Sequence, residues 1–203
     1  MPTEVRRERA LLVEILAPVT DRPEVAADAL LASNRDLGWI VTADSRVLAM
    51  LCRDRAVVAH LERIRALLAL SLRHQVFDRP LIDNIPKVVD YLNFEIGRRA
   101  DERLVVLFPD AKGKVADELY LDGGADTVVV CTRSILLRAL LTGAVGVVLA
   151  HNHPSGDHTP SKADIAVTRE LARALRAVDV RLHDHLIVGN GTGYTSMRER
   201  NLL

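Results

Sequence analysis

Cysteine is almost absent from the sequence, and this scarcity excludes two kinds of chemistry. Cys52 and Cys131 lie far apart, and no CxxC pair is present. A zinc site built from thiolates and a dithiol redox couple are therefore excluded. The lack of a disulfide framework favours the reducing cytoplasm as the location of the protein.

Long apolar runs are also missing. Charged residues interrupt the opening stretch, MPTEVRRERALLVEIL, so it lacks the continuous apolar core of a secretion signal. The longest apolar candidates elsewhere are broken by Arg, Asp or Gly before they could span a bilayer. We therefore expect no membrane insertion.

Net charge is the third property that the chain lacks. Its 27 Lys and Arg residues balance 27 Asp and Glu residues, so no overall field attracts a polyanion such as DNA. Local basic faces are still compatible with this balance. With 49% hydrophobic and 27% charged residues, the composition is that of a soluble globular protein.

The first part of the chain has a helical pattern. Between residues 7 and 74, apolar residues recur at steps of three and four, which predicts four or five short helices. This period is lost over residues 77–86, a stretch that contains two prolines. We therefore predict a small all-helical domain, residues 1–79, followed by a second domain, residues 80–203.

The second domain alternates helices and strands. The pattern predicts a helix over 86–99, a hairpin of strands at 102–110 and 115–124, and a third strand, TVVVC, at 127–131. A helix at 134–143, a central strand at 146–150, a helix at 160–178 and a strand at 180–189 follow. This order predicts an α/β domain with helices flanking one sheet.

Several potential metal ligands follow the central strand. His151 and His153 are two residues apart on an extended segment, so their imidazoles point to the same side. Asp164 would lie in the first turn of the next helix and bring a carboxylate to the pair. Two His and one carboxylate leave one tetrahedral position open, as catalytic zinc sites do. The set predicts Zn²⁺ as the cofactor.

Hydrolysis at such a site needs a general base. The carboxylates that precede the histidines and could serve are Glu95, Glu102, Glu118 and Asp117. We favour Glu102, because it opens the first strand of the sheet and a neighbouring strand can place it beside the metal. Spacing alone does not settle this choice.

The same residues also suit purely structural roles. The two histidines can cap backbone carbonyls, and Ser161 and Asp164 have the spacing of a helix capping box. The letters HNH invite comparison with HNH nucleases. The apolar strand and the Pro-Ser-Gly that flank them are not typical of the hairpin-and-helix metal fold of those enzymes.

The string HNHPSGDHTPSKAD, with DHLIVG and YTSMRERNLL after it, resembles RadC-type proteins, a bacterial branch of the JAMM or MPN-plus superfamily. The superfamily pattern is an upstream Glu, then His-x-His-Pro, then a Ser and an Asp at fixed distances. His151, His153, Ser161 and Asp164 meet every spacing. The resemblance covers residues 83–203 and implies a JAMM/MPN-like, cytidine-deaminase-like sheet flanked by helices.

The resemblance also implies an activity. His151, His153 and Asp164 would bind zinc. Glu102 would polarise the attacking water and carry its proton, and Ser161 would donate to the developing oxyanion. By analogy the bond attacked is an amide or isopeptide bond, so the expected partner is a protein or peptide substrate.

Other residues near the predicted site are less clearly assigned. Asn152 stands where eukaryotic deubiquitinating members usually have serine or threonine. Asp184 and His185 match the family string, and His183 precedes them on the same predicted strand. They predict either groups that orient the ligands or a second metal site. We expect His183 and His185 to share one face of the strand and Asp184 to take the other.

The first domain resembles the family less. RadC-type proteins usually carry a helix-hairpin-helix turn whose glycines let the backbone approach a phosphate, and MLCRDRAVVAHL at 50–61 has neither glycine. Residues 1–79 are therefore expected to be a degenerate helix-hairpin-helix-like domain. A second hypothesis for function is a DNA-associated accessory protein of repair or recombination. A noncatalytic scaffold is a third, and the complete ligand set argues against it.

Overall fold

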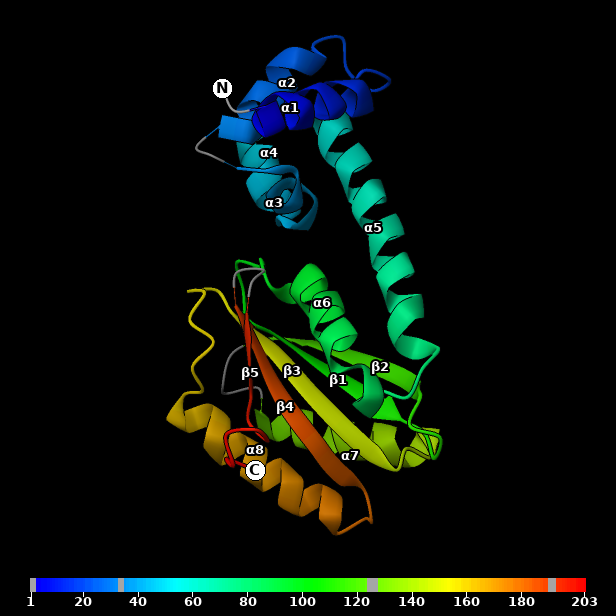
Figure 1. Ribbon diagram of the computed structural model, residues 1–203. Helices are drawn as coiled ribbons and strands as arrows, with labels where there is room; N and C mark the ends of the chain where they lie inside the picture. The colour runs from blue at the N-terminus through cyan, green and yellow to red at the C-terminus, as the bar shows by residue number, and fades with distance from the viewer. Residues whose placement is uncertain (1–2, 33–34, 124–127, 190–192) are drawn as a thin grey trace. The chain divides into compact units, whose positions relative to one another are not determined.

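The computed structural model of the protein describes residues 3–32, 35–123, 128–189 and 193–203 (Figure 1). Contacts divide the chain into two compact units, Met1–Leu70 and Ser71–Leu203. This division falls inside a long helix, upstream of the boundary expected between residues 79 and 80. None of the helices in the described ranges is both long and apolar enough to cross a membrane.

The first unit is helical, as its apolar periodicity predicts. It contains α1 (Thr3–Leu16), α2 (Pro23–Leu31), α3 (Leu37–Thr42), α4 (Ser45–Cys52) and most of α5 (Arg55–Phe77). Pro23 occupies the first turn of α2, while Asp36 and Asp44 cap α3 and α4 with their side chains. Leu12, Leu16, Leu30 and Ile40 are among the fully buried residues of its core.

The turn between α4 and α5 corresponds to the predicted hairpin. Arg53 adopts the left-handed conformation, with φ of 55°, that glycine more commonly takes at a helix C-terminus. Asp54 then accepts hydrogen bonds from the amides of Ala56 and Val57, at 2.9 and 3.3 Å. A carboxylate therefore already occupies the helix N-terminus, where a phosphate would otherwise bind.

The second unit is a mixed α/β domain, as predicted. A 3₁₀ turn (Ile82–Asn84) leads into α6 (Ile85–Ile96), followed by β1 (Arg103–Pro109), β2 (Val115–Asp122) and α7 (Val128–Thr142). Then come β3 (Gly146–His153), α8 (Lys162–Arg176), β4 (Arg181–Gly189) and β5 (Tyr194–Ser196). The strands are ordered β2-β1-β3-β4-β5, and only β3 and β4 run parallel (Figure 1).

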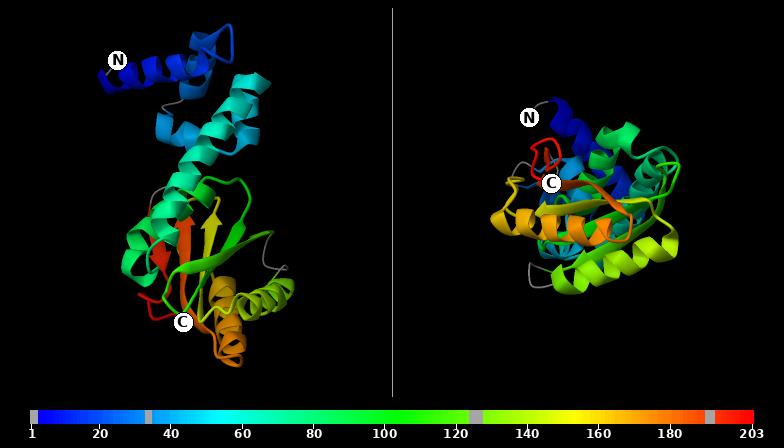
Figure 2. Two further views of the ribbon diagram at one scale, coloured as in Figure 1. Left: turned by 90° about the vertical axis from the view of Figure 1, so that its right-hand side faces the viewer. Right: turned by 90° about the horizontal axis from the view of Figure 1, so that it is seen from below.

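Both faces of this sheet are covered. Alternate residues of β1 show why: Val105 and Leu107 face a core formed with α6 and the end of α5, whereas Val106 and Phe108 face a core formed with α7 and α8. Figure 2 shows the two sets of helices on opposite sides of the strands. β3 is buried along almost its whole length, which fits its continuous apolar sequence.

The strand expected at 127–131 is wrong. Val128–Cys131 form the first turn of α7, and Thr127 lies outside the described residues. Valine lowers helix stability only by tenths of a kcal/mol, roughly, so its preference for strands is easily overridden. The following apolar stripe provides the reason, because Ile135 and Ala139 are buried against the sheet and continue the helix from the same turn.

Candidate metal centre

The two predicted histidine ligands lie at the carboxyl end of β3. His151 is buried and His153 partly buried, and their rings lie 4.8 Å apart between centroids. The period of two along a strand puts both on the same side, and their Nε2 atoms are 3.0 Å apart.

Asp164 reaches this pair from the first turn of α8. Its Oδ1 lies 3.5 Å from Nε2 of His151, and its Oδ2 lies 3.5 Å from Nε2 of His153. Its Oδ2 also accepts a hydrogen bond from the Ser161 amide at 2.7 Å, and its own amide donates to Ser161 Oγ at 3.1 Å. The capping box is therefore present, and it orients the carboxylate toward the histidines.

These three side chains fit a zinc ion. Their ligand atoms all lie within 4.8 Å of one another, and the shortest separations are 3.0 and 3.5 Å. Two ligands that each lie about 2.0–2.1 Å from a tetrahedral zinc are about 3.3 Å apart. The observed spacings therefore match the donor set of a tetrahedral site with one position left open.

Hydrogen bonds on the far side of each imidazole favour the tautomer that a metal requires. Nδ1 of His153 donates to the backbone carbonyl of Asp157 at 2.5 Å. Nδ1 of His151 lies 2.8 Å from Nε2 of His185. When both Nδ1 atoms donate, both Nε2 atoms keep a lone pair for the cation.

The hydrogen bond to His185 belongs to a longer chain of hydrogen bonds. Nδ1 of His185 lies 2.6 Å from Thr168 Oγ1, whose hydroxyl donates to the backbone carbonyl of Asp164 at 2.5 Å. Each group in this chain has one donor and one acceptor, so a single set of proton positions satisfies all of them. The sequence indicated His185 as an orienting group. It carried no signal for Thr168, which lies on α8.

Burial and hydrogen bonding shift the pKa values of His151, His185 and Asp164. Burial lowers the pKa of His151 to about 4, and it holds the pKa of His185 well below its usual value. Burial acts to raise the pKa of Asp164, but the hydrogen bond from Ser161 and the nearby His151 bring it below its usual value. For His151 and Asp164, a neutral imidazole and an ionised carboxylate are the forms that bind a cation.

Glu102, the predicted general base, lies one residue before β1 and has an exposed side chain. The antiparallel pairing of Leu104 with His151, continued by two residues, places Glu102 opposite His153. The buried side chain of Asn152 holds this segment in place. It accepts from the Arg103 amide at 2.8 Å and donates to the Asp101 carbonyl at 3.2 Å.

Two of the alternative bases are engaged elsewhere. Glu118 accepts from Arg73 at 2.8 Å and from the Tyr91 hydroxyl at 2.9 Å. Asp117 forms an ion pair with Arg138. Both lie on β2, which is separated from β3 by β1. Their ion pairs favour Glu102 over these two carboxylates.

Asp184 is held away from the three ligands. Its carboxylate accepts from Ser196 Oγ at 2.6 Å and from the Arg198 amide at 3.0 Å, so it ties β4 to the segment of β5. We expected His183 and His185 to share one face of the strand, but a β-bulge at His183 interrupts the alternation. Val147 pairs with Leu182 and Val148 with Asp184, so His183 is the extra residue. Among the described residues, the group of candidate ligands is His151, His153 and Asp164.

The loop between β3 and α8 makes two contacts that sequence spacing did not indicate. Nδ1 of His158 lies 2.9 Å from Thr195 Oγ1 on β5. Gly189 at the end of β4 approaches Gly156 so closely that a Cβ at Gly189 would lie 2.4 Å from the Gly156 carbonyl oxygen. Glycine is required there because no side chain fits between the two backbones.

Comparison with known proteins agrees with these features. Residues 82–202 match the RadC-like JAB domain family. The chain is 37% identical over 196 residues to a UPF0758 protein of Paracidovorax citrulli, covering 94% of this chain and 80% of that protein. It is 40% identical over 137 residues to a UPF0758 protein of Rhodobacter capsulatus, covering 67% of this chain and 64% of that protein. The chain therefore belongs to the RadC-like JAB domain family.

Proposed function

We propose that this protein is a zinc-dependent hydrolase of amide bonds, a metallopeptidase or isopeptidase. The observation that carries the proposal is the convergence of His151, His153 and Asp164 at separations that suit a tetrahedral zinc. Zinc bound there would supply Lewis acidity, which lowers the pKa of water and polarises a carbonyl. The residues around it then have separate tasks.

Glu102 is assigned the role of general base. It takes the proton from the attacking water and returns it to the leaving amine. Its place before β1, opposite His153 in the extended register, supports this role. The Asn152 side chain supports it further, since it holds the backbone on both sides of Glu102.

Ser161 is assigned the stabilisation of negative charge on the substrate carbonyl oxygen. Its Oγ accepts a hydrogen bond from the Asp164 amide, which leaves the hydroxyl hydrogen able to donate. A hydroxyl that is already held by a helix cap needs little reorganisation as charge develops, and this favours the transition state.

The metal content of the purified protein tests whether His151, His153 and Asp164 bind zinc. Wild-type protein is expected to carry one zinc per chain, and His153→Ala is expected to lose it because one of three protein ligands is removed. His183→Ala is the matched control, since this histidine is outside the ligand group. Zinc retained in His153→Ala, measured by elemental analysis, would refute the site.

The role of Glu102 is tested separately, with a library of fluorescence-quenched peptides as the substrate. Glu102→Gln should retain zinc and lose about 10²–10⁴-fold in the hydrolysis rate, because general-base catalysis contributes that range. Asp117→Asn removes a competing candidate base and should leave the rate unchanged. An undiminished rate in Glu102→Gln contradicts the assignment.

The described structure gives less support to the second hypothesis, a DNA-associated role of the helical unit. The amides at the start of α5 are already occupied by the Asp54 carboxylate, which would repel a phosphate. DNA binding by this unit stays a prediction from the resemblance.

A further inference from the structure

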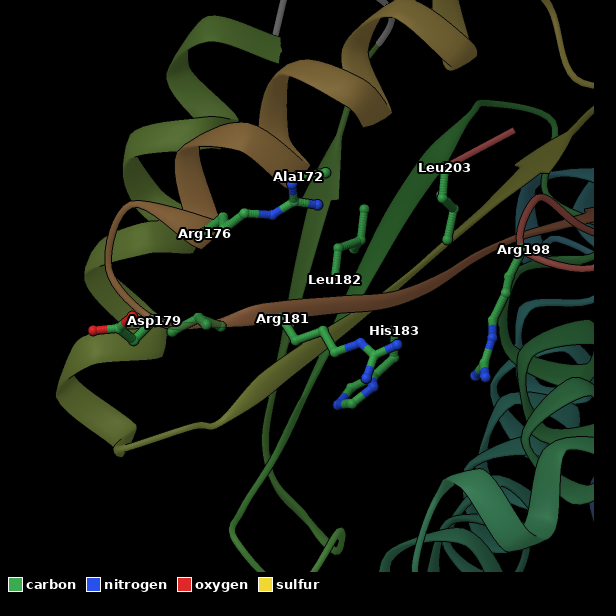
Figure 3. A pocket seen from close by; sticks show the side chains of 9 residues that line it. Ala172, Arg176, Asp179, Arg181, Leu182, His183, Arg198 and Leu203 are labelled. Carbon is green, nitrogen blue, oxygen red and sulfur yellow. The ribbon is translucent and has the colours of Figure 1, made fainter. Parts of the chain in front are cut away.

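A concave region lies on the unit that holds the candidate metal site. It is a cavity of about 550 Å³, within the usual range for small-molecule sites. Its lining comes from the end of α8, the start of β4 and the segment after β5, and Figure 3 shows these side chains. The residues are Ala172, Arg176, Asp179, Val180, Arg181, Leu182, His183, Arg198 and Leu203.

The cavity has an excess of positive charge. Three arginines line it, against one acidic side chain, that of Asp179. In Figure 3 that carboxylate points away from Arg181 and His183. Within the described part of the chain, no salt bridge neutralises Arg176, Arg181 or Arg198. An anion would therefore meet uncompensated guanidinium groups.

The β-bulge in β4 builds one side of this cavity. His183 is the extra residue between the pairs Val147–Leu182 and Val148–Asp184. Its imidazole fills the space beside Gly146, where an added Cβ would lie 2.1 Å from His183 Nε2. The ring lies against Gly146, and Arg181 extends alongside it (Figure 3). Bulges commonly re-aim side chains in this way next to binding sites.

The electrostatics of His183 agree with the geometry. Burial lowers its pKa, and the positive charges of Arg181 and Arg198 lower it further. Both guanidinium groups therefore act on one ring, and a bound anion would relieve their mutual repulsion.

We propose that this cavity binds the phosphate group of a nucleotide-sized ligand or of a nucleic-acid strand. Arginine forks pair with phosphate oxygens in a bidentate manner, and Arg181 and Arg198, which both act on His183, supply donors for a phosphomonoester or phosphodiester. The apolar side chains of Ala172 and Leu182 and the volume of the cavity leave room for an organic group attached to the phosphate. A free inorganic ion would leave most of this lining uncovered.

This site is separate from the metal centre. In the parallel pairing of β3 with β4, Gly146 pairs with Arg181 and His153 pairs with Gly189. Seven residues of strand separate these two ends, which at about 3.3 Å per residue is roughly 23 Å. Substitutions in the cavity are therefore expected to leave zinc content unchanged, and the two proposals fail or succeed independently.

Binding is tested by calorimetry and fluorescence anisotropy at low ionic strength, where charged contacts are least screened. The probes are inorganic phosphate, adenosine monophosphate and a fluorescent single-stranded oligonucleotide. We expect the wild type to bind adenosine monophosphate more tightly than phosphate. An oligonucleotide that binds more tightly still identifies nucleic acid as the source of the phosphate, and one that binds no more tightly identifies a small molecule.

The variants Arg181→Gln and Arg198→Gln should each weaken binding by about 10–100-fold, because each removes a charge-assisted hydrogen bond. Arg133→Gln, an exposed arginine on α7, makes the same change in net charge away from the cavity. Its affinity should equal that of the wild type. The proposal is overturned if none of the probes binds, or if Arg133→Gln weakens binding as much as the two cavity variants do.

Discussion

At the scale of single residues, the site depends on where a few protons lie. His151 can bind a metal through Nε2 only if its Nδ1 carries the hydrogen, and the bond to His185 supports that arrangement. Thr168 and the Asp164 carbonyl continue the chain, so the ligand from β3 and the ligand from α8 share one set of hydrogen bonds. The candidate metal site is therefore oriented by groups that are not themselves candidate ligands.

Replacing His185 tests this arrangement. His185→Leu leaves the three ligands in place but removes the acceptor for His151 Nδ1, so zinc affinity should fall by about 10–100-fold. Competition with a chromogenic chelator measures this affinity. His183→Leu makes the same change on the same strand, outside the ligand group, and should bind zinc as the wild type does. Equal affinities for the two variants would contradict the role of His185.

The buried histidines also predict how stability depends on pH once zinc is removed. The pKa of His151 falls to about 4 in the folded protein, from 6.5 in the unfolded chain, so the unfolded state binds more protons between these values. The contribution of His151 to the free energy of unfolding is therefore fully present above about pH 6.5. It is lost as the pH falls toward 4, by about 3 kcal/mol. His185 acts in the same direction.

Denaturant unfolding of the zinc-free protein between pH 4 and 7 checks this prediction. His151→Gln should flatten the decline, whereas His74→Gln, an exposed residue of α5, should not. A stability curve with the same slope in His151→Gln and in the wild type would show that another group controls the pH dependence.

At the scale of elements, β3 carries ligands and also positions its neighbour. Asn152, between the two histidines, bonds to the backbone of residues just before and at the start of β1. Glu102 lies between those bonds. The strand that carries two candidate metal ligands therefore also holds the segment that carries the proposed base.

Asn152→Ala should lower the free energy of unfolding by about 1–3 kcal/mol, because it removes the hydrogen bonds that this buried side chain makes to the Arg103 amide and the Asp101 carbonyl. It should also slow peptide hydrolysis while zinc remains bound. Asn84→Ala, which loses an exposed hydrogen bond to the Gln75 carbonyl, is the control. It should lower the free energy of unfolding by less than Asn152→Ala does. Urea unfolding measures the free energy, and elemental analysis measures the zinc content. An unchanged free energy of unfolding in Asn152→Ala would show that Asn152 does not hold the segment around Glu102.

Elements also differ in how far the sequence predicts them. The helices of the first unit and the strands β1–β4 follow from periodicity, because each buries one face or both. The helical conformation of Val128–Cys131 does not follow from periodicity. A β-branched run favours a strand locally, whereas α7 buries its later residues against the sheet. The bulge at His183 was equally hidden, since its cause is the pairing with β3.

At the scale of the whole molecule, the position of the boundary between the two units has a measurable consequence. Val76 and Phe77, at the end of α5, pack into the core of the second unit, and Arg73 pairs with Glu118 there. A cut at residue 79 would remove all three side chains from that unit. A cut between Leu70 and Ser71 would retain them.

The fragment 71–203 should therefore be more stable than the fragment 80–203, by at least about 2 kcal/mol, since burial of one Val side chain alone contributes about that much. Denaturant unfolding of both fragments measures the difference. Fragments of equal stability would show that the end of α5 contributes nothing and that the boundary at 79/80 is the better one.

The sequence by itself identified His151, His153 and Asp164 as candidate ligands, because strand alternation and helix capping act over a few neighbouring residues and because the spacing matches that of RadC-type proteins. It also determined the α/β class of the second unit. Only the tertiary structure decided which groups orient those ligands, where the α7 helix begins, and which arginines gather around the cavity. These depend on contacts between segments far apart in the chain, and such contacts follow from packing, not from local spacing.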